Sequence, residues 1–404
     1  MKASLLLAYV AAALVLQVGI ALIIAFWRRS RAAPPAGAPL ALPAPGVWGG
    51  WREFRVARRQ YEDRAHTLCS FHLEPVDGAP LPPFLPGQFL TFEVPVSADR
   101  TLIRCYSLSD GPGANSYRIS VKRVLAPAGR PELPPGACSG HLHDRLQVGD
   151  IVRARAPSGR FVVDDDPGVP TVLIAGGIGI TPLLSMLRGG LAAQAKRAVY
   201  LFYGARRGAE HGFKGELEEL ARLHPTFHVK VVYSQPDLDD LSGQDVPSAG
   251  HVDIDLLRRT LPAGRHQFYV CAPPPMMASL LPALLAWGVQ PDDIHHESFG
   301  PASVQSAQVS SRAEGPRASS SFEVMFRRSA RTLVWDGEDA NLLDFAERHA
   351  LSVESGCRSG SCGTCEVKVI TGTVRYDLPP DREITPGHCL LCVGVPDGPL
   401  ELEA

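Results

Sequence analysis

Four cysteines near the C-terminus have a spacing that suits one kind of metal centre. The run Cys357-x4-Cys362-x2-Cys365 is followed, after another 26 residues, by Cys392. This is the ligand spacing of a 2Fe-2S cluster, in which four thiolates hold two bridged irons. Glycines in the loop let backbone amides turn toward the sulfides, where a Cβ would not fit. Zinc is the alternative, but structural zinc sites favour paired C-x2-C knuckles, so the spacing predicts a role in electron transfer.

The fourth ligand has two candidates, because Cys389 and Cys392 both follow the loop. The segment from Leu390 to Pro396 resembles the plant-type ferredoxin pattern, whose last ligand lies four residues before a proline. We therefore predict Cys392 as the ligand. Cys389 is interpreted as a small buried hydrophobic residue, the common role of a free thiol.

A glycine-rich loop follows a predicted strand over 171–175. It contains Gly176, Gly177 and Gly179 and leads through Thr181 and Pro182 into a predicted helix. Glycines at such a turn let the backbone approach a pyrophosphate, which the free amides of the helix N-terminus attract. Pro182 replaces the last glycine of the usual dinucleotide fingerprint, and simple strand-to-helix packing is the alternative reading.

Another polar motif, Arg104-Cys-Tyr106-Ser107, lies on a predicted strand of the first half of the chain. Alternation along a strand places Arg104 and Tyr106 on one face. There the arginine suits a phosphate and the tyrosine suits a flat ring. An ordinary strand with outward polar residues is the alternative.

A further anion site is predicted at Gly136-Ala-Cys-Ser139. Ser139 is expected to be the N-cap of a helix that begins at Gly140, which would aim free amides at a negative group.

The surrounding elements divide the chain into units. Short alternating runs separated by Gly, Pro and Asp turns predict an antiparallel β-barrel over 51–166. Strands alternating with helices predict a parallel-sheet α/β domain over 167–300. Residues 301–320 lack hydrophobic periodicity and predict a linker, and residues 321–404 predict an α+β unit around the cysteine loop.

The N-terminus predicts a membrane anchor over 3–27. Residues 3–26 are uncharged and mostly aliphatic, and Trp27, Arg28, Arg29 and Arg31 follow. One helix of this length crosses a hydrocarbon core of about 30 Å. The arginines place the rest of the chain in the cytoplasm, as a single-pass protein of the inner membrane. A cleaved signal peptide is the alternative, but its charge would precede the apolar region. A Pro/Ala-rich linker is expected over 28–50.

The net charge and the cysteine content limit the kinds of protein that this chain could be. The net charge is −2, which argues against nucleic-acid binding. Residues 321–404 hold eight Lys/Arg against fourteen Asp/Glu, a net −6 that suits either steering onto a basic partner or a solvated surface. Nine cysteines, four of them in the cluster motif, suit a reducing compartment.

Together these motifs resemble the ferredoxin–NADP reductase superfamily. Its flavin motifs R-x-Y-S/T and G-x-x-S/T match Arg104–Ser107 and Gly136–Ser139, and its G-G-x-G-x-T/S-P loop matches Gly176–Pro182. The segment Cys271-Ala272-Pro-Pro-Pro-Met276 is similar to its Cys-Gly-x-x-x-Met element, and Glu297-Ser-Phe299-Gly300 to its closing acidic–aromatic element. The order, reductase then ferredoxin, is similar to the phthalate and vanillate oxygenase reductases.

The resemblance implies a role for each site residue. Arg104, Gly136 and Ser139 would hold the flavin phosphates, Tyr106 would pack on the isoalloxazine, and Ser107 would hydrogen-bond near its N5. The residues Gly176, Gly177, Gly179, Thr181 and Pro182 would cradle the nicotinamide dinucleotide. Cys271 would lie beside the nicotinamide C4, with Glu297 and Phe299 nearby and Glu297 relaying charge or protons.

The implied protein is a membrane-tethered reductase. Its domains would be an FAD-binding β-barrel (51–166), an NAD(P)-binding domain (167–300) and a β-grasp ferredoxin domain (321–404). The segment 156–161 favours FAD over FMN. NADH or NADPH would deliver hydride, a 2Fe-2S cluster would carry single electrons, and an oxygenase, hydroxylase or desaturase would receive them. NADH input to quinone, or a non-enzymatic electron relay, are the alternatives. Arg206 and Arg207 would suit a 2′-phosphate, yet similar reductases mostly use NADH.

Overall fold

The computed structural model describes the chain from residue 48 to residue 404 with gaps. The residues outside the description are 1–47, 114, 127–131, 133, 164–165, 167, 194–195, 242–247, 298, 300–320, 359, 361, 377–379 and 381–383. The predicted anchor (3–27), most of the linker 28–50, and the linker 301–320 therefore lie outside the described residues. Within the described residues, no helix has both the length and the apolar character that a membrane span requires.

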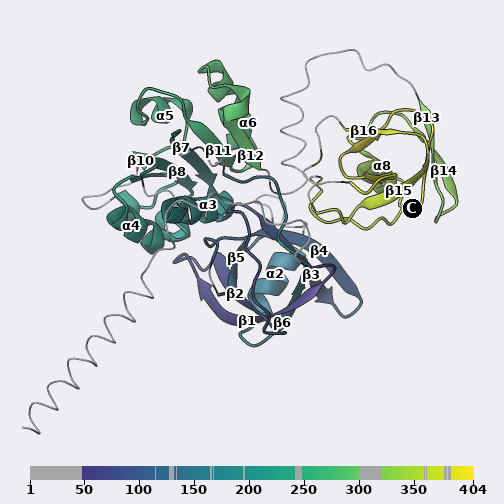
Figure 1. Cartoon of the computed structure of the whole chain (residues 1–404), viewed down its shortest axis with the longest axis horizontal. Coiled ribbons are helices and arrows are strands. Elements are labelled where there is room, and N and C mark those ends of the chain that lie inside the picture. The colour runs from purple at the N-terminus through teal and green to yellow at the C-terminus, as the bar shows by residue number, and fades with distance from the viewer. Residues whose placement is uncertain are drawn as a thin grey trace, which may run out of the picture.

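The first unit is a curved six-stranded antiparallel sheet with one helix (Figure 1). Its elements are β1 (Arg52–Tyr61), β2 (Leu68–Pro75), β3 (Phe89–Ser97), β4 (Arg100–Ser107), β5 (Tyr117–Lys122), α2 (Ala137–Asp144) and β6 (Ile151–Ala154). The strand order is β4-β3-β6-β1-β2-β5, so β4 and β5 are the edges. A single bridge between Leu108 and Ile119 joins these edges at one end. The predicted barrel is therefore a half-barrel that closes only there.

Alternating burial along the strands explains this curvature. On β1, Phe54 and Val56 are fully buried while Arg55 between them is exposed. The inward residues of all strands meet the apolar face of α2, where Cys138 and Leu142 complete one core. A sheet with one apolar face must bury that face, either by curling or by packing against a helix. This sheet curls and is also covered by α2.

The second unit is a six-stranded parallel sheet with helices on both faces, as the alternation of strands and helices predicts. Its elements are β7 (Thr171–Gly176), α3 (Ile180–Ala193), β8 (Val199–Ala205), α4 (Lys214–Leu223), β9 (Phe227–Tyr233), β10 (Ser248–Ala249), α5 (Ile254–Thr260), β11 (Gln267–Cys271), α6 (Pro274–Ala286) and β12 (Ile294–Glu297). The strand order is β10-β9-β8-β7-β11-β12. The order reverses between β7 and β11, and ligands of open α/β sheets bind at the carboxyl ends of strands at such a point.

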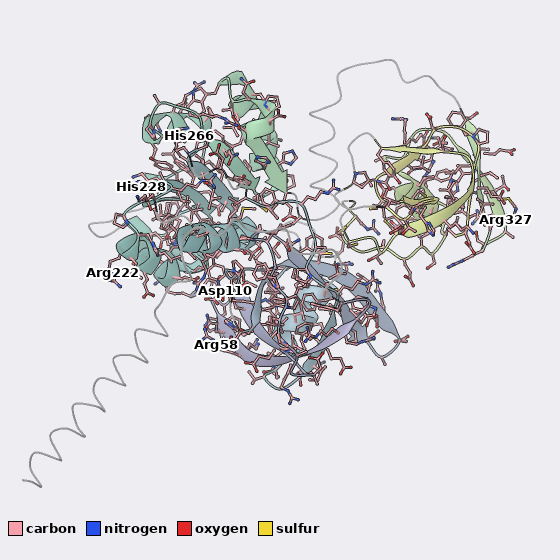
Figure 2. All side chains as sticks on the ribbon, in the orientation of Figure 1. Arg58, Asp110, Arg222, His228, His266 and Arg327 are labelled. Atoms are coloured by element: carbon pink, nitrogen blue, oxygen red, sulfur yellow. The ribbon has the colours of Figure 1, made fainter. Side chains whose placement is uncertain are left out.

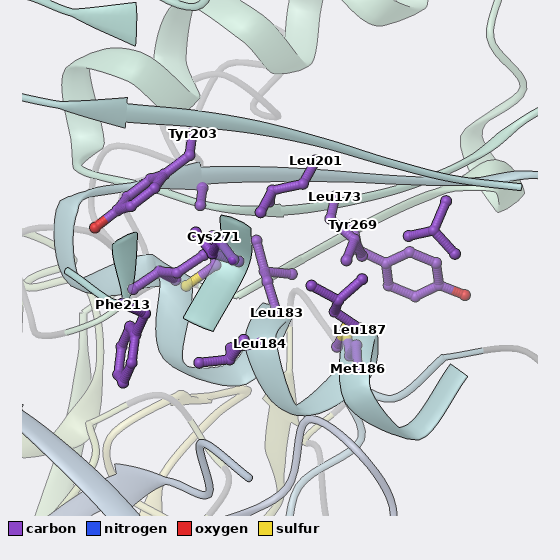
Figure 3. Packing of buried hydrophobic residues seen from close by; sticks show 14 of the residues in the cluster. Leu173, Leu183, Leu184, Met186, Leu187, Leu201, Tyr203, Phe213, Tyr269 and Cys271 are labelled. Atoms are coloured by element: carbon purple, nitrogen blue, oxygen red, sulfur yellow. The ribbon is translucent and has the colours of Figure 1, made fainter. Parts of the chain in front are cut away.

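Both faces of the sheet are covered at its centre, which is why β7 and β11 are wholly buried and mostly apolar. Leu173 and Ala175 of β7 face the core that α3 covers, whereas Val172 and Ile174 face the opposite core under α5 and α6. Figure 3 shows the first core, with Leu183 and Leu187 of α3 packed under the strands and the Cys271 sulfur among them.

The third unit contains the cysteine loop and a mixed sheet. Its elements are β13 (Phe322–Phe326), β14 (Arg331–Trp335), α8 (Leu342–Arg348), β15 (Glu366–Thr371), β16 (Val374–Tyr376), β17 (His388–Leu390), β18 (Gly394–Pro396) and β19 (Leu400–Leu402). The larger sheet has the order β14-β13-β19-β15-β17, with β13 and β19 parallel. Asn341 caps α8 by accepting from the Asp344 amide at 2.9 Å. The Phe345 ring packs against Trp335 with ring centroids 5.1 Å apart and anchors this core.

An ion network around the buried Arg118 joins the first two units. Arg118 of β5 pairs with Glu216 of α4 at 2.9 Å. Arg188 of α3 also pairs with Glu216 and reaches Asp110 at 2.7 Å. Figure 2 labels Asp110 at the boundary of the two units. The network ties the half-barrel to α3 and α4 of the α/β unit.

Candidate functional site

The four predicted cluster cysteines lie together. Cys357 and Cys362 are within 4.8 Å of each other, measured between sulfurs. Cys392 contacts Cys365 and Cys357, and these contacts raise the pKa of the Cys392 thiol. The sulfurs thus form two adjoining pairs, Cys357 with Cys362 and Cys365 with Cys392. Each iron of a four-thiolate 2Fe-2S cluster needs two such ligands, so the donor set fits that cluster.

The loop backbone supports this fit. The amide of Cys357 donates to the Cys362 sulfur at 3.2 Å, and the amide of Cys362 donates to the Cys357 sulfur at the same distance. Amides that face sulfurs favour the thiolate form that a metal requires. Positive φ angles of 56° at Arg358 and 80° at Gly360 produce this inward turn.

Cys389 shares its buried core with Cys365 and Cys392. It lies on β17 with 1% of its surface exposed, inside the core of the third unit. Burial raises the pKa of Cys389 to about 12. The structure thus places Cys392, rather than Cys389, beside the loop sulfurs.

Strand β4 presents the flavin motif on one face. Its register pairs Arg104 with Phe92 and Tyr106 with Leu90, and both β3 partners belong to the core. Tyr106 packs against Phe92 with ring centroids 5.8 Å apart, and burial raises the pKa of the Tyr106 phenol. Ser107 ends the strand and is 6% exposed. Arg104 is exposed and, among the described residues, forms no ion pair.

The predicted helix start at Ser139 is wrong. Helix α2 begins at Ala137 with Gly136 as its N-cap, so Ser139 lies within the first turn. The Ser139 hydroxyl donates to the Gly136 carbonyl at 3.0 Å and accepts from the Val124 amide at 3.1 Å. The hydroxyl therefore ties the helix start to the segment after β5, and glycine at the N-cap gives the first amides no side-chain cap.

Arg100 is a candidate phosphate ligand that the sequence motifs did not reveal. It lies four residues before Arg104 on β4, so strand alternation places both arginines on the same face. Burial raises the pKa of Cys138 in α2, and the charges of Arg104 and Arg100 partly offset that rise. Both guanidinium groups therefore act at the N-terminal end of α2, and within the described residues Arg100 also forms no ion pair. Two uncompensated cations beside free helix amides fit a pyrophosphate.

The glycine loop after β7 contacts the segment after β11. A Cβ on Gly179 would overlap the Cys271 carbonyl, and one on Gly176 would overlap Pro273 and lie 2.9 Å from the Ala272 Cβ. Gly177 adopts a φ of 53° with nothing nearby. The glycines are therefore required by this close approach, which brings the two predicted nicotinamide motifs to one edge of the sheet.

The start of α3 completes this loop. Thr181 is 2% exposed, and its hydroxyl donates to the Ile178 carbonyl at 3.0 Å. Pro182 lies in the first turn, where a helix needs no amide donor. Pro182 therefore replaces the usual glycine without cost to the helix.

Cys271 and Glu297 are neighbours across β11 and β12. Cys271 is 1% exposed, and its burial, followed by the charge of Glu297, raises the pKa of the thiol well above its ordinary value. Cys271 is therefore a neutral thiol at the carboxyl edge of the sheet. Phe299, two residues after β12, is 39% exposed.

The cluster loop contacts the half-barrel on β4. Cys105 lies within 4.8 Å of both Cys357 and Cys362, measured between sulfurs. A Cβ on Gly356 would lie 3.1 Å from Cγ2 of Ile103. Cys105 and Ile103 occupy the face of β4 opposite Arg104 and Tyr106. One strand therefore carries Arg104 and Tyr106 of the flavin motif on one face and the cluster contact on the other.

Three family models match the chain in the order of the three units. They are an oxidoreductase FAD-binding domain over residues 68–163, an oxidoreductase NAD-binding domain over 173–281, and a 2Fe-2S iron-sulfur cluster binding domain over 326–397. The chain therefore carries FAD-binding, NAD-binding and 2Fe-2S domains.

A protein of related sequence and a solved structure are similar to a large part of this chain. A flavohemoprotein of Rhizobium meliloti is 39% identical over 257 residues, 63% of this chain and 62% of the relative. The chain thus spans about 62% of the length of such relatives. The FAD/NAD-binding domain of a nitric oxide dioxygenase from Vibrio cholerae aligns with a TM-score of 0.55 and 34% identity, covering 62% of this chain and 99% of that domain.

A second solved structure includes the cluster domain. Phthalate dioxygenase reductase aligns with a TM-score of 0.53 and 27% identity, over 88% of this chain and 98% of that protein. The family models, the near-complete coverage of the Vibrio cholerae domain and the shared motifs lead to one assignment. The chain belongs to the ferredoxin–NADP reductase superfamily of flavoprotein oxidoreductases and carries a C-terminal 2Fe-2S ferredoxin domain.

Proposed function

We propose that this protein transfers electrons from NAD(P)H through FAD and a 2Fe-2S cluster to a protein acceptor of the oxygenase, hydroxylase or desaturase type. The observation that carries this proposal is the position of β4. Arg104 and Tyr106 of the flavin motif lie on one face of this strand, and on the opposite face Cys105 lies against the cluster cysteines. The chemistry that a bound flavin supplies is exchange between a two-electron hydride and single electrons.

The half-barrel residues would bind and orient the flavin. Arg104, Arg100 and the amides after Gly136 would hold the phosphates, with Ser139 shaping the helix start. Tyr106 would present its ring to the isoalloxazine, and the buried Ser107 hydroxyl would donate near its N5.

The α/β residues would bind the nicotinamide dinucleotide at the carboxyl edge of the sheet. Gly176, Gly177 and Gly179 would admit the pyrophosphate to the start of α3, next to Thr181. Cys271, a neutral buried thiol, would border the nicotinamide, and Glu297 would hold a proton or charge beside it. Phe299 would cover the ring from the exposed side and exclude water.

NADH is the coenzyme that the surface after β8 favours. Arg207 already pairs with Glu210 at 3.7 Å and with Asp237 at 3.3 Å. Arg206 is 61% exposed and lies 4.0 Å from Glu210. These carboxylates compensate the guanidinium charges and would repel a 2′-phosphate.

A membrane anchor over 3–27 is part of this proposal. The evidence is the uncharged apolar run, followed by Trp27 and three arginines, which favours a single-pass protein of the inner membrane with cytoplasmic domains. An anchored reductase would suit an acceptor in the same membrane. Carbonate extraction of membranes tests the anchor: full-length chain should stay in the pellet, and a chain without residues 1–31 should not.

The first experiment is an absorption spectrum of the purified chain before and after anaerobic NADH, then NADPH. Flavin and iron–sulfur bands that both bleach with NADH support the proposed path and coenzyme. Bands that do not change with either nucleotide would contradict the proposed path. The protein would then be an electron relay that receives electrons from another donor. Zinc in place of iron would contradict the cluster assignment.

The class of the electron acceptor is tested by a separate measurement. NADH oxidation should be fast with one-electron protein acceptors such as cytochrome c and slow with a soluble quinone. A preference for quinone would replace the oxygenase-type acceptor with a respiratory one.

A further inference from the structure

Cys105 is the middle residue of the flavin motif, and neither flavin binding nor nicotinamide binding uses it. It lies on the face of β4 that meets the third unit, with its sulfur within 4.8 Å of the Cys357 and Cys362 sulfurs. Its nearest partner in the half-barrel is the Thr91 hydroxyl at 3.4 Å, across the β3–β4 ladder. Thr91 is 1% exposed, so this side of Cys105 is closed to water.

The contact around Cys105 is close. Gly356 precedes the first cluster ligand and approaches Ile103 so nearly that an added Cβ would lie 3.1 Å from Cγ2 of Ile103 and 2.8 Å from the Cys362 sulfur. Strand β4 therefore lies against the ligand loop itself. The Cys105 sulfur therefore has the Thr91 hydroxyl at 3.4 Å and two ligand sulfurs within 4.8 Å.

Hydrogen bonds to ligand sulfurs are one of the means by which proteins set iron–sulfur potentials. A donor removes charge from the thiolate and so stabilises the reduced cluster, which carries one more electron. Thiols are weak donors, but thiolate sulfurs are charged acceptors, and bonds to charged acceptors are the stronger kind.

We infer that Cys105 is a tuning residue whose thiol donates a hydrogen bond to a cluster-ligand sulfur and raises the reduction potential of the cluster while it is docked on the flavin domain. This inference rests on the proposed function for its cluster and its electron donor. It goes further in assigning the potential of that cluster partly to a residue of the flavin-binding domain. Docking then favours electron transfer in the forward direction.

The test is an EPR-monitored redox titration of the full-length holoprotein with dithionite. Cys105→Val keeps a side chain of similar size and removes the donor. We expect its one-electron equilibrium to shift about tenfold toward the oxidised cluster, which is about 59 mV. Cys105→Ser keeps a donor and should stay near the wild-type potential. Cys69→Val, a thiol loss in the buried core of the same half-barrel, is the matched control and should leave the potential unchanged.

Pulsed EPR of the reduced cluster gives a second measurement. A proton that exchanges in deuterated buffer should couple to the wild-type cluster and be absent in Cys105→Val. If the valine variant does not assemble a cluster, Cys105→Ala is measured in its place. An unchanged potential with an unchanged proton signal would overturn the inference, as would an equal shift in the serine variant.

Dithionite reduces the cluster directly, so this result does not depend on NADH. A protein whose cluster NADH cannot reduce would contradict the proposed function and leave the tuning by Cys105 measurable.

Discussion

The half-barrel meets its two neighbours through different chemistry. Toward the α/β unit, the contact is a buried ion network in which Arg118, with 5% of its side chain exposed, shares Glu216 with Arg188. Toward the ferredoxin unit, the contact includes the sulfur of Cys105 and the methyl groups of Ile103 against the cluster loop. A buried charge pair is costly to separate, whereas apolar and thiol contacts separate without leaving an unpaired charge.

This difference suits the two transfers. Hydride transfer requires the donor and acceptor rings in contact at fixed orientation, so the flavin and nicotinamide units benefit from a rigid boundary. Single-electron transfer tolerates more variation in geometry. The ferredoxin unit must also give its electron to an external partner, which a boundary of weaker contacts permits.

The largest expected effect is the loss of a cluster ligand at the second boundary. Cys362→Ser should abolish the iron–sulfur EPR signal and lower NADH-driven cytochrome c reduction by more than about 100-fold, because ligand loss exceeds the effect of removing an outer partner. Flavin reduction by NADH should persist, as followed by stopped-flow absorbance. Cys389→Ser is the matched control, since this thiol is buried in the same core but belongs to neither ligand pair. Normal cytochrome c reduction in Cys362→Ser would refute the cluster assignment.

Breaking the first boundary should mainly affect stability. Glu216→Gln leaves Arg118 buried without its carboxylate, which should lower the free energy of unfolding by about 3–5 kcal/mol. Urea titration followed by circular dichroism and flavin fluorescence measures this. Glu218→Gln, on the same helix but with a side chain 65% exposed and 3.9 Å from Lys214, should change it by less than about 1 kcal/mol. Equal effects of the two variants would show that the network does not stabilise the boundary.

Acid should destabilise the α/β unit through the buried His211. This residue is 6% exposed, its Nδ1 lies 2.8 Å from the Tyr233 hydroxyl, and burial lowers its pKa to about 4. The unfolded chain binds the proton below about pH 6.5, so stability is complete above that pH and decreases as the pH falls toward 4, by up to about 3 kcal/mol.

His211→Gln should flatten this dependence, measured as the thermal midpoint from pH 4 to pH 8. His228→Gln, at an exposed position on β9, is the control. An unchanged pH profile in His211→Gln would contradict the assignment.

The smallest expected effect is at the approach of the cluster loop to β4. In Gly356→Ala, the new Cβ would meet the Cys362 sulfur at 2.8 Å and Ile103 at 3.1 Å, so the loop or the strand must shift at a cost of about 1–3 kcal/mol. We expect slower flavin-to-cluster electron transfer by stopped flow, with cluster content retained. Gly398→Ala adds a Cβ that meets nothing within 4 Å and should have no effect. Wild-type rates in Gly356→Ala would argue against this contact in solution.

Sequence reasoning predicted most of the regular elements because their patterns are local. The strand over 171–175 and the helix that follows its glycine loop match the observed β7 and α3 closely. The short α5 and the polar β12 were not anticipated, since seven residues and a His-His pair carry little periodic signal. The helix start at Ser139 was misplaced because the chosen hydroxyl caps nothing and instead binds backbone groups on both sides.

The site was predicted unevenly for the same reason. Motif residues such as Tyr106, Gly179 and Cys357 stand at fixed spacings, so the sequence alone revealed them. Arg100 and Cys105 belong to no spacing rule, and their relevance depends on which face of β4 meets α2 and which meets the ferredoxin unit.

By itself, the sequence determined the chemical types: thiolate ligands at cluster spacing, a glycine loop between strand and helix, and an arginine–tyrosine–serine strand. These follow from bonds and backbone angles within a few residues of one another. Only the tertiary structure decided that Gly179 contacts Cys271, that Glu216 unites Arg118 with Arg188, and that Cys105 faces the cluster ligands. Those contacts join residues tens to hundreds of positions apart. They exist because the segments after β7 and β11 meet at one edge of the parallel sheet, and because the half-barrel is packed against the other two units, which no local pattern encodes.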